Sequence, residues 1–133
     1  MKAIMYFDGG SRGNPGNAGS GAALFAGGIE VASVSASLPF GSTNNEAEYM
    51  GLIKGMELAL DCGYDEIEIF GDSLLVVNQV HSVWKCKNKR LQVLLSDVGI
   101  LRKRFKTFEL SHVFRKDNSR ADELANEAMD RVA

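Results

Sequence analysis

The order of strand and helix patterns most constrains the fold of this 133-residue chain. Residues 2–7 carry the bulky apolar side chains typical of a strand. Residues 19–26 and 29–38 are two further strand patterns around Gly27-Gly28, a pair suited to a tight hairpin. Three such patterns in succession predict an antiparallel meander. Helix and strand patterns alternate after it, which predicts parallel strands joined by helical crossovers.

Helical periodicity accounts for most of the remaining chain. The clearest helix follows the cap-type residues Thr43-Asn44-Asn45 and ends before Gly63. The other predicted elements are helices beginning near Ser73, Leu91 and residues 117–119, and strands at residues 66–70 and 108–114. The predicted order is therefore βββαβααβα.

This order predicts an α/β fold with a mixed five-stranded sheet, in which three antiparallel strands are followed by parallel strands and helices cover both faces. We expect one domain over residues 1–133, because the length is that of an ordinary domain. In such sheets, functional sites gather where strands end and the strand direction switches. Asp8 and Asp72 directly follow strand patterns, so both are expected at that edge.

The net charge does not indicate a strongly basic nucleic-acid-binding module, since 15 basic residues stand against 17 acidic ones. The basic residues nevertheless concentrate in two runs that could form local phosphate-facing surfaces. The runs are Lys85, Lys87, Lys89 and Arg90, and Arg102, Lys103, Arg104 and Lys106. Taken alone, each run is more typical of a solvated face.

No targeting or membrane segment is evident in the sequence. The apolar stretch before Asp8 is too short for a secretory signal, and no apolar run approaches the roughly 18 residues of a membrane span. Cys62 and Cys86 lie far apart without a nearby Cys or His partner, which argues against a zinc site or a disulfide framework. We expect a cytoplasmic, monomeric protein with reduced thiols and no membrane attachment.

Several acidic residues are placed for metal-dependent chemistry on phosphodiesters. Two Mg²⁺ ions about 3.5–4 Å apart can activate water and stabilise the departing oxygen, and Mg²⁺ prefers carboxylate oxygens. The candidates are Asp8 and Asp72 at strand ends, Glu46 or Glu48 early in the first long helix, and Asp122 early in the last one. Spacing alone does not bring them together, and each taken singly is more typical of a surface or capping carboxylate.

Four short segments share their order and separations with one protein family. They are Phe7-Asp8-Gly9-Gly10-Ser11-Arg12-Gly13-Asn14-Pro15-Gly16, Thr43-Asn44-Asn45-Glu46-Ala47-Glu48-Tyr49, Phe70-Gly71-Asp72-Ser73 and Asn118-Ser119-Arg120-Ala121-Asp122-Glu123-Leu124-Ala125. Together they resemble type 1 ribonuclease H in its short, bacterial and archaeal-like form. The resemblance extends over nearly the whole chain, and it also implies the ribonuclease H-like sheet described above.

The resemblance implies that Asp8, Glu48, Asp72 and Asp122 form the catalytic, metal-binding set, with Asp122 the most peripheral. Glu48 is preferred to Glu46 by the motif, because helix phase does not decide between them. The implied cofactor is Mg²⁺, with Mn²⁺ as an alternative, as two ions when substrate is bound. The implied activity is hydrolysis of the RNA strand of an RNA/DNA hybrid, leaving 5′-phosphate and 3′-hydroxyl ends.

The resemblance also implies how the hybrid partner is held. Side-chain amides offer both a donor and an acceptor, which suits reading of 2′-hydroxyls in the minor groove. Asn44 or Asn45 could instead cap the first helix, and Trp84 either packs under the sugar-phosphate backbone or anchors a helix start. Thr43 and Lys87-Asn88 match the walls of a DNA phosphate pocket. The full predicted contact set is Gly9, Ser11, Gly13, Asn14, Thr43, Asn44, Asn45, Ser73, Trp84, Asn88, Arg115 and Asn118.

Two features depart from the family pattern. The basic helical insertion of longer relatives has no room between residues 80 and 91, so we expect modest and strongly salt-dependent affinity. The loop at residues 115–118 is shortened and lacks the family's mobile histidine, so Arg115 or Lys116 is expected nearest its place. We interpret His112 as a structural residue at a strand end, and His81 as a surface residue.

Three other functions are compatible with parts of the sequence. A catalytically weak or inactive nucleic-acid-binding module is disfavoured because all four acidic positions are intact. A nucleotide-binding switch is disfavoured because the glycine-rich stretch lacks the GK[ST] ending of a P-loop. A transposase-like nuclease of related fold would cut DNA, and only its substrate preference would distinguish it from a ribonuclease H.

Overall fold

The structure is a computed structural model that describes residues 1–132. Its strands are β1 (Lys2–Arg12), β2 (Asn17–Ala26), β3 (Ile29–Ser37), β4 (Glu66–Gly71) and β5 (Thr107–His112). Its helices are α1 (Asn44–Asp61), α2 (Leu74–Val80), α3 (Lys89–Arg102) and α4 (Ser119–Val132), with a short 3₁₀ turn, η1 (Arg115–Asp117). This confirms the predicted order βββαβααβα.

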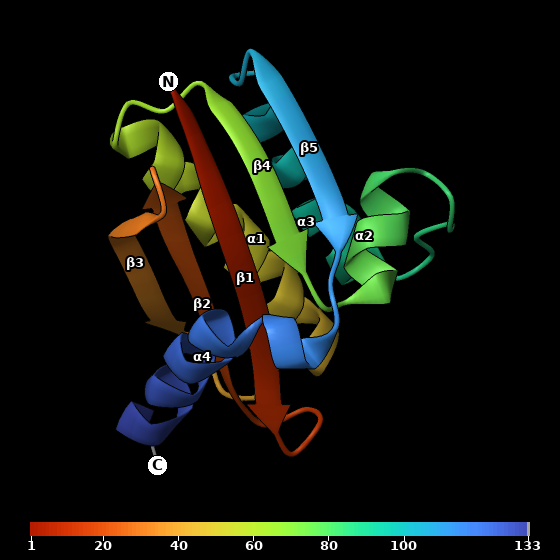
Figure 1. Cartoon of the computed structure of the whole chain (residues 1–133). Coiled ribbons are helices and arrows are strands. Elements are labelled where there is room, and N and C mark those ends of the chain that lie inside the picture. Colours follow the sequence, from red (N-terminus) through yellow and green to blue (C-terminus); the bar gives the residue numbers. More distant parts are fainter. Residues whose placement is uncertain (133) are drawn as a thin grey trace.

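The five strands form one mixed sheet in the order β3-β2-β1-β4-β5. The β1–β2 and β2–β3 pairs are antiparallel, and the β1–β4 and β4–β5 pairs are parallel. In Figure 1, α1 and α3 lie behind the sheet, α2 lies beside the end of β5, and α4 crosses in front of β1, β2 and β3. The predicted fold class is confirmed, including helices on both faces.

The main core lies between α1 and the sheet. It contains Met5, Leu24, Leu52, Met56 and Ile69, each fully buried. Side chains alternate across a strand, so buried residues recur at every second position in β4 and in β1 as far as Phe7. The Gly27-Gly28 hairpin is also present, with positive φ angles of 59° and 77° that suit a tight two-residue turn.

Strand β1 is longer than the sequence pattern indicated. Residues 9–12 were expected in a loop, but they pair with residues 17–20 of β2, and Asp8 pairs with Gly21 within the antiparallel ladder. Asp8 therefore lies inside β1, at the point where its parallel pairing with β4 stops at Phe7 and Gly71. The glycines here permit close packing rather than a turn. The last strand also differs, because β5 ends at His112 and not at residue 114.

The N-terminus of α1 is fixed by a capping box. The Thr43 hydroxyl accepts a hydrogen bond from the Glu46 amide, and the Glu46 carboxylate accepts one from the Thr43 amide. Neither Asn44 nor Asn45 caps the helix, as considered from the sequence, because Asn44 instead accepts a hydrogen bond from the Ser11 amide. Within residues 1–132, no helix combines the length and apolar character needed to cross a bilayer.

Candidate active site

Asp8 and Asp72 lie side by side because β1 and β4 are parallel and in register. Phe7 pairs with Gly71, so the next residue of each strand leaves the ladder at the same level. Asp8 continues in β1, whereas Asp72 begins the turn into α2, whose first residues are capped by the Ser73 hydroxyl. The sequence placed both aspartates at this edge of the parallel strands, and the structure brings them together.

Glu48 reaches the same point because α1 approaches β1 unusually closely. A Cβ atom at Gly9 would collide with the backbone carbonyl of Ala47, and one at Gly51 would collide with the backbone carbonyl oxygen of Asp8. The two glycines therefore let the helix backbone contact the strand backbone beside Asp8. Glu48 lies there, whereas Glu46 belongs to the capping box.

Asp8, Glu48 and Asp72 form a compact acidic cluster, in which one carboxylate oxygen from each lies within 4.8 Å of the others. Asp8 and Glu48 are buried, with exposed fractions of 6% and 7%. Burial and the charge of Asp72 raise the pKa of Asp8 to about 7, even though the Gly9 amide donates a hydrogen bond to it at 2.9 Å. Burial and the charges of both aspartates raise the pKa of Glu48 well above its ordinary value.

The cluster suits a hard divalent cation. Three carboxylates packed this closely repel one another unless they are protonated or share a positive charge. Glu48 Oε1 is buried and has no hydrogen-bond partner among the described residues, which suits an oxygen that coordinates a cation. Oxygen donors of this kind are the ligands that Mg²⁺ and Mn²⁺ prefer.

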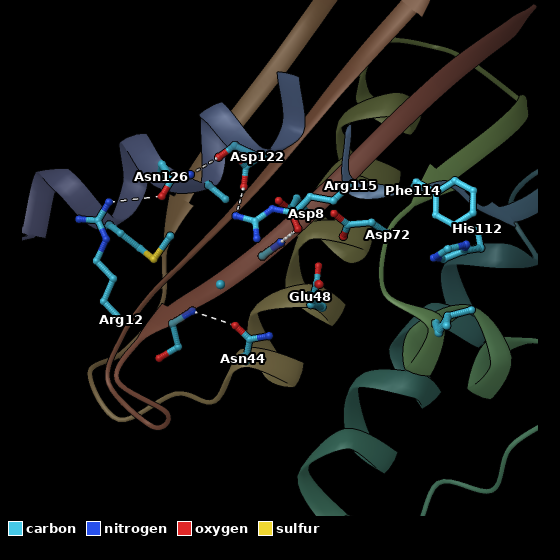
Figure 2. Close-up of a pocket in the computed structure, with 16 residues that line it drawn as sticks. Asp8, Arg12, Asn44, Glu48, Asp72, His112, Phe114, Arg115, Asp122 and Asn126 are labelled. Carbon is cyan, nitrogen blue, oxygen red and sulfur yellow. Dashed lines mark hydrogen bonds and ion pairs between the residues drawn. The ribbon is translucent and has the colours of Figure 1, made fainter. Parts of the chain in front are cut away.

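Asp122 lies outside the three-residue cluster but faces the same cleft from the first turn of α4. Arg115 reaches it from the η1 turn, with its Nη2 3.7 Å from Asp122 Oδ1 (Figure 2). Arg115, rather than Lys116, therefore lies beside the peripheral carboxylate. His112 ends β5, as interpreted from the sequence, and its ring makes an edge contact with Phe114.

A cleft of about 650 Å³ runs past the acidic cluster. Figure 2 shows its two ends, with Arg12 at one, His112 and Phe114 at the other, and the carboxylates between them. The predicted site residues that line it are Asp8, Gly9, Ser11, Asn44, Glu48, Asp72, Arg115 and Asp122. A polynucleotide strand laid along this cleft would cross the carboxylates midway.

The remaining predicted contacts lie elsewhere. Asn14 accepts a hydrogen bond from the Asn44 amide at 2.9 Å, which ties the glycine-rich turn containing Gly13 to the start of α1. Asn45 lies next to Asn44 in the first turn of α1 and is half-buried. Ser73 is 9% exposed and caps α2.

Thr43 and Asn88 cap two neighbouring helices. Asn88 accepts hydrogen bonds from the first amides of α3, just as Thr43 caps α1. Arg90 lies 3.5 Å from Glu46, so the two helix starts are adjacent. Helix N-termini attract anions. Trp84 is 47% exposed and lines a separate hollow on α2 and the segment before α3.

Asn118 differs from the predicted substrate contact. Its side chain is 1% exposed, and its amide donates a hydrogen bond to the Phe7 carbonyl at 2.8 Å. The backbone carbonyl oxygen of Asn118 accepts a hydrogen bond from the Asp122 backbone amide, whereas the side-chain Oδ1 is buried and has no hydrogen-bond partner among the described residues. Asn118 therefore ties the start of α4 to the residue before Asp8 and has no free surface to offer a ligand.

Sequence reasoning missed several cleft residues. Leu74, Phe114 and Asn126 all line the cleft but belong to no recognised motif position. Arg12 lies within the first family segment, but the sequence pattern gives it no role. It lies on the same face of β1 as Asp8, four residues further on, and the sequence does not reveal this because the glycine-rich segment predicts a loop.

The mixed sheet, the cleft and the buried carboxylates together define a ribonuclease H-like domain with a candidate divalent-metal site. Comparisons with known proteins agree. A family model described as "Reverse transcriptase-like" matches residues 6–128. A ribonuclease H of Hydrogenovibrio crunogenus is 33% identical over 96% of this chain and 95% of its own length. The chain belongs to the ribonuclease H family, and its relatives include the type 1 enzymes.

Two solved structures extend the likeness. Ribonuclease HI of Halobacterium salinarum is 42% identical over 94% of this chain, and its crystal structure superposes with a TM-score of 0.95, covering 98% of this chain and 99% of that one. LC11-RNase H1, solved in complex with an RNA/DNA hybrid, is 36% identical with a TM-score of 0.91 and 98% coverage of both chains. The chain spans 63% of the full-length Halobacterium protein and 37% of its mycobacterial relatives.

Proposed function

We propose that this protein is an endonuclease that hydrolyses the RNA strand of RNA/DNA hybrids. The observation that carries the proposal is the buried cluster of Asp8, Glu48 and Asp72 in a cleft that continues to both sides. The hybrid bound by the LC11-RNase H1 relative supports the same substrate here. We further propose that residues 1–133 act as a single domain, monomeric and cytoplasmic.

The acidic cluster would hold two Mg²⁺ ions, with Mn²⁺ as an alternative, and Asp122 would complete the ligand set from α4. When bound, the ions would supply an activated water and stabilise the departing 3′ oxygen, which leaves 5′-phosphate and 3′-hydroxyl ends. The hydrogen bond from the Gly9 amide orients Asp8 within the cluster. Because the pKa of Asp8 is raised to about 7, a proton and a cation compete for its carboxylate near neutral pH.

Arg115 would stabilise negative charge near Asp122. Its guanidinium stays protonated at any physiological pH, so it would not relay protons as a histidine can. His112 is further along the cleft beside Phe114, and Arg115 is the cation recorded at the peripheral carboxylate. We propose that Arg115 assists product release or charge balance rather than proton transfer.

The hybrid would be read from both strands. The Ser11 amide and the Asn44 side chain, which are hydrogen-bonded at 3.1 Å, lie in the cleft where 2′-hydroxyls of the RNA strand would pass. The paired N-termini of α1 and α3, capped by Thr43 and Asn88, would receive a phosphate of the DNA strand. Gly13, Asn14 and Asn45 would support these contacts from the adjoining turn and helix. Trp84 would stack on the sugar-phosphate chain beyond them.

The test is a cleavage assay with each strand labelled in turn. We expect Mg²⁺-dependent cutting of the RNA strand of a hybrid, no cutting of duplex DNA, and no cutting by Asp72→Asn, whose circular dichroism and melting should show retained folding. Hybrid binding without cutting would favour the inactive binding module. Equal cutting of duplex DNA would favour the transposase-like reading.

A further inference from the structure

Arg12 is a cation at one end of a cleft whose centre is acidic. It ends β1, and its side chain lines the same hollow as Asp8, Glu48 and Asp72. Residues 8, 10 and 12 of a strand point to the same face. The residue between them is Gly10, so β1 itself contributes no side chain between Asp8 and Arg12, and the side chains of Asn44 and Met129 lie over this glycine.

Two side chains of α4 hold the Arg12 guanidinium in this position. Its Nη1 lies 2.6 Å from Asp130 Oδ1, and its Nη2 donates to Asn126 Oδ1 at 3.3 Å. Asn126 in turn donates to the Asp122 carbonyl at 3.0 Å, one helical turn away. Figure 2 shows this series of contacts leading from Arg12 to Asp122 along one wall of the cleft.

The held guanidinium retains capacity for a ligand. An arginine has five N–H donors in a fixed fork that matches a phosphate, and the two contacts on α4 use only part of them. The side chain is 43% exposed, whereas its partner Asp130 is 66% exposed. Surface ion pairs of this kind contribute little to stability, so the arrangement orders the arginine more than it stabilises the fold.

Position decides which phosphate Arg12 can reach. Four residues of strand separate it from Asp8, which corresponds to about 13 Å between the two Cα atoms. A strand whose reacting phosphate lies at the acidic cluster would therefore present a neighbouring phosphate to Arg12.

We propose that Arg12 binds a non-scissile phosphate of the RNA strand and so fixes the register of that strand over the carboxylates. The inference rests on the proposed hybrid cleavage and extends it by naming a strand contact at the end of the cleft. Arg12 acts on substrate binding, and the chemical step stays with the acidic cluster.

Steady-state kinetics on a short hybrid test the proposal through four substitutions. Arg12→Ala raises KM about five-fold with kcat changed less than two-fold, and it lowers the slope of log(kcat/KM) against log[salt] by about one. Arg12→Lys recovers part of the loss. Arg131→Ala is the matched control, because Arg131 is an exposed arginine of α4 that binds Ser35 on β3 and does not line the cleft.

Asp130→Asn separates phosphate binding from a structural role. If Arg12 binds phosphate, Asp130→Asn keeps the wild-type salt slope and raises KM less than Arg12→Ala does, because the guanidinium charge is still present and Asn126 still holds it. If Arg12 only braces α4, Asp130→Asn reproduces the loss seen in Arg12→Ala and overturns the proposal. Melting temperatures of all variants show whether folding is retained.

A chemical probe locates the contact. Neutral methylphosphonate placed at one non-scissile RNA phosphate at a time weakens wild-type binding at one position, and that penalty disappears in Arg12→Ala. Equal penalties in both proteins at every position overturn the inference while leaving hybrid cleavage intact. A wild-type protein that neither binds nor cuts hybrid overturns the proposed function and this inference together.

Discussion

Asp8 is the residue at which folding and chemistry conflict most strongly. Burial and the neighbouring charge of Asp72 raise its pKa from the ordinary 3.8 to about 7. At pH values between these two pKa values, the folded protein binds more protons at Asp8 than the unfolded chain does. The contribution of Asp8 to stability is therefore present in acid and is lost as the pH rises through this interval.

We predict that metal-free protein becomes less stable between pH 5 and pH 8, and that Mg²⁺ restores more stability at pH 8 than at pH 5. Asp8→Asn should raise the unfolding free energy at pH 8 without metal by about 1–3 kcal/mol, because it removes one of the repelling charges. Urea unfolding in EDTA and in Mg²⁺ measures both effects. An identical pH profile for wild type and Asp8→Asn would contradict this account of the cluster.

Asn118 offers a second test at the same scale. Its amide bonds the Phe7 carbonyl in the interior, so Asn118→Ala should destabilise the fold by about 1–3 kcal/mol through an unpaired buried carbonyl. Asn78→Ala is the control, since its amide bonds the Leu74 carbonyl in an exposed setting on α2. Chemical unfolding of the two variants compares them directly. Equal losses would mean that the buried contact has no special weight.

At the scale of elements, the approach of α1 to β1 positions Glu48. We predict that Gly51→Ala destabilises the protein by about 1–3 kcal/mol, because the new methyl group would collide with the backbone carbonyl oxygen of Asp8. It should also weaken Mn²⁺ binding, since the helix must retreat from the cluster. Gly99→Ala in α3 meets no atom within 4 Å and should stabilise by about 0.5–1 kcal/mol. Calorimetric titration and unfolding check both; unchanged Mn²⁺ affinity in Gly51→Ala would contradict the role of this contact.

Periodicity predicted the elements well because it reports which face of each one is buried. The helical stripe after Thr43 and the alternation of residues 66–70 both reappear as α1 and β4. The extension of β1 through Arg12 could not be read, because glycine-rich residues are typical of loops. Only the small residues of β2 and the close approach of α1 and α4 make an extended strand favourable there.

The site was predictable to the extent that short motifs specify it. The meeting of Asp8, Glu48 and Asp72 depends on register and helix approach, which spacing alone did not establish. The resemblance implies a substrate contact for Asn118, whereas its side chain is 1% exposed and bonds the Phe7 carbonyl, because a motif position does not specify which way a side chain points. The sequence gives Arg12 no role, because a residue in a predicted loop has no strand periodicity that would show which face its side chain occupies.

At the scale of the whole molecule, the two basic runs lie at different ends of the sheet. Lys87 and Lys89 adjoin the N-terminus of α3 beside the start of α1, whereas Arg104 and Lys106 precede β5 at the opposite end from Asp72. In Figure 1 these are the two ends of α3 and its flanking segments. The net charge of −2 gives no general attraction for nucleic acid, so local placement decides.

We predict that the double variant Lys87→Ala/Lys89→Ala raises KM for the hybrid. It also makes the slope of log(kcat/KM) against log[salt] shallower by up to about two, because each lost phosphate contact no longer releases a counterion. Arg104→Ala with Lys106→Ala should leave both unchanged. Kinetics between low and physiological salt distinguish the pairs. Equal effects of the two double variants would indicate general charge attraction rather than a defined path for the hybrid.

The proposed mechanism requires divalent cations to bind where the carboxylates of Asp8, Glu48 and Asp72 meet. Anomalous diffraction from crystals soaked in Mn²⁺ measures this directly. We predict a peak within coordination distance of Asp8, Glu48 and Asp72 that is absent from Asp8→Asn crystals. A wild-type crystal with ordered carboxylates and no anomalous density at the cluster would contradict the metal-dependent mechanism.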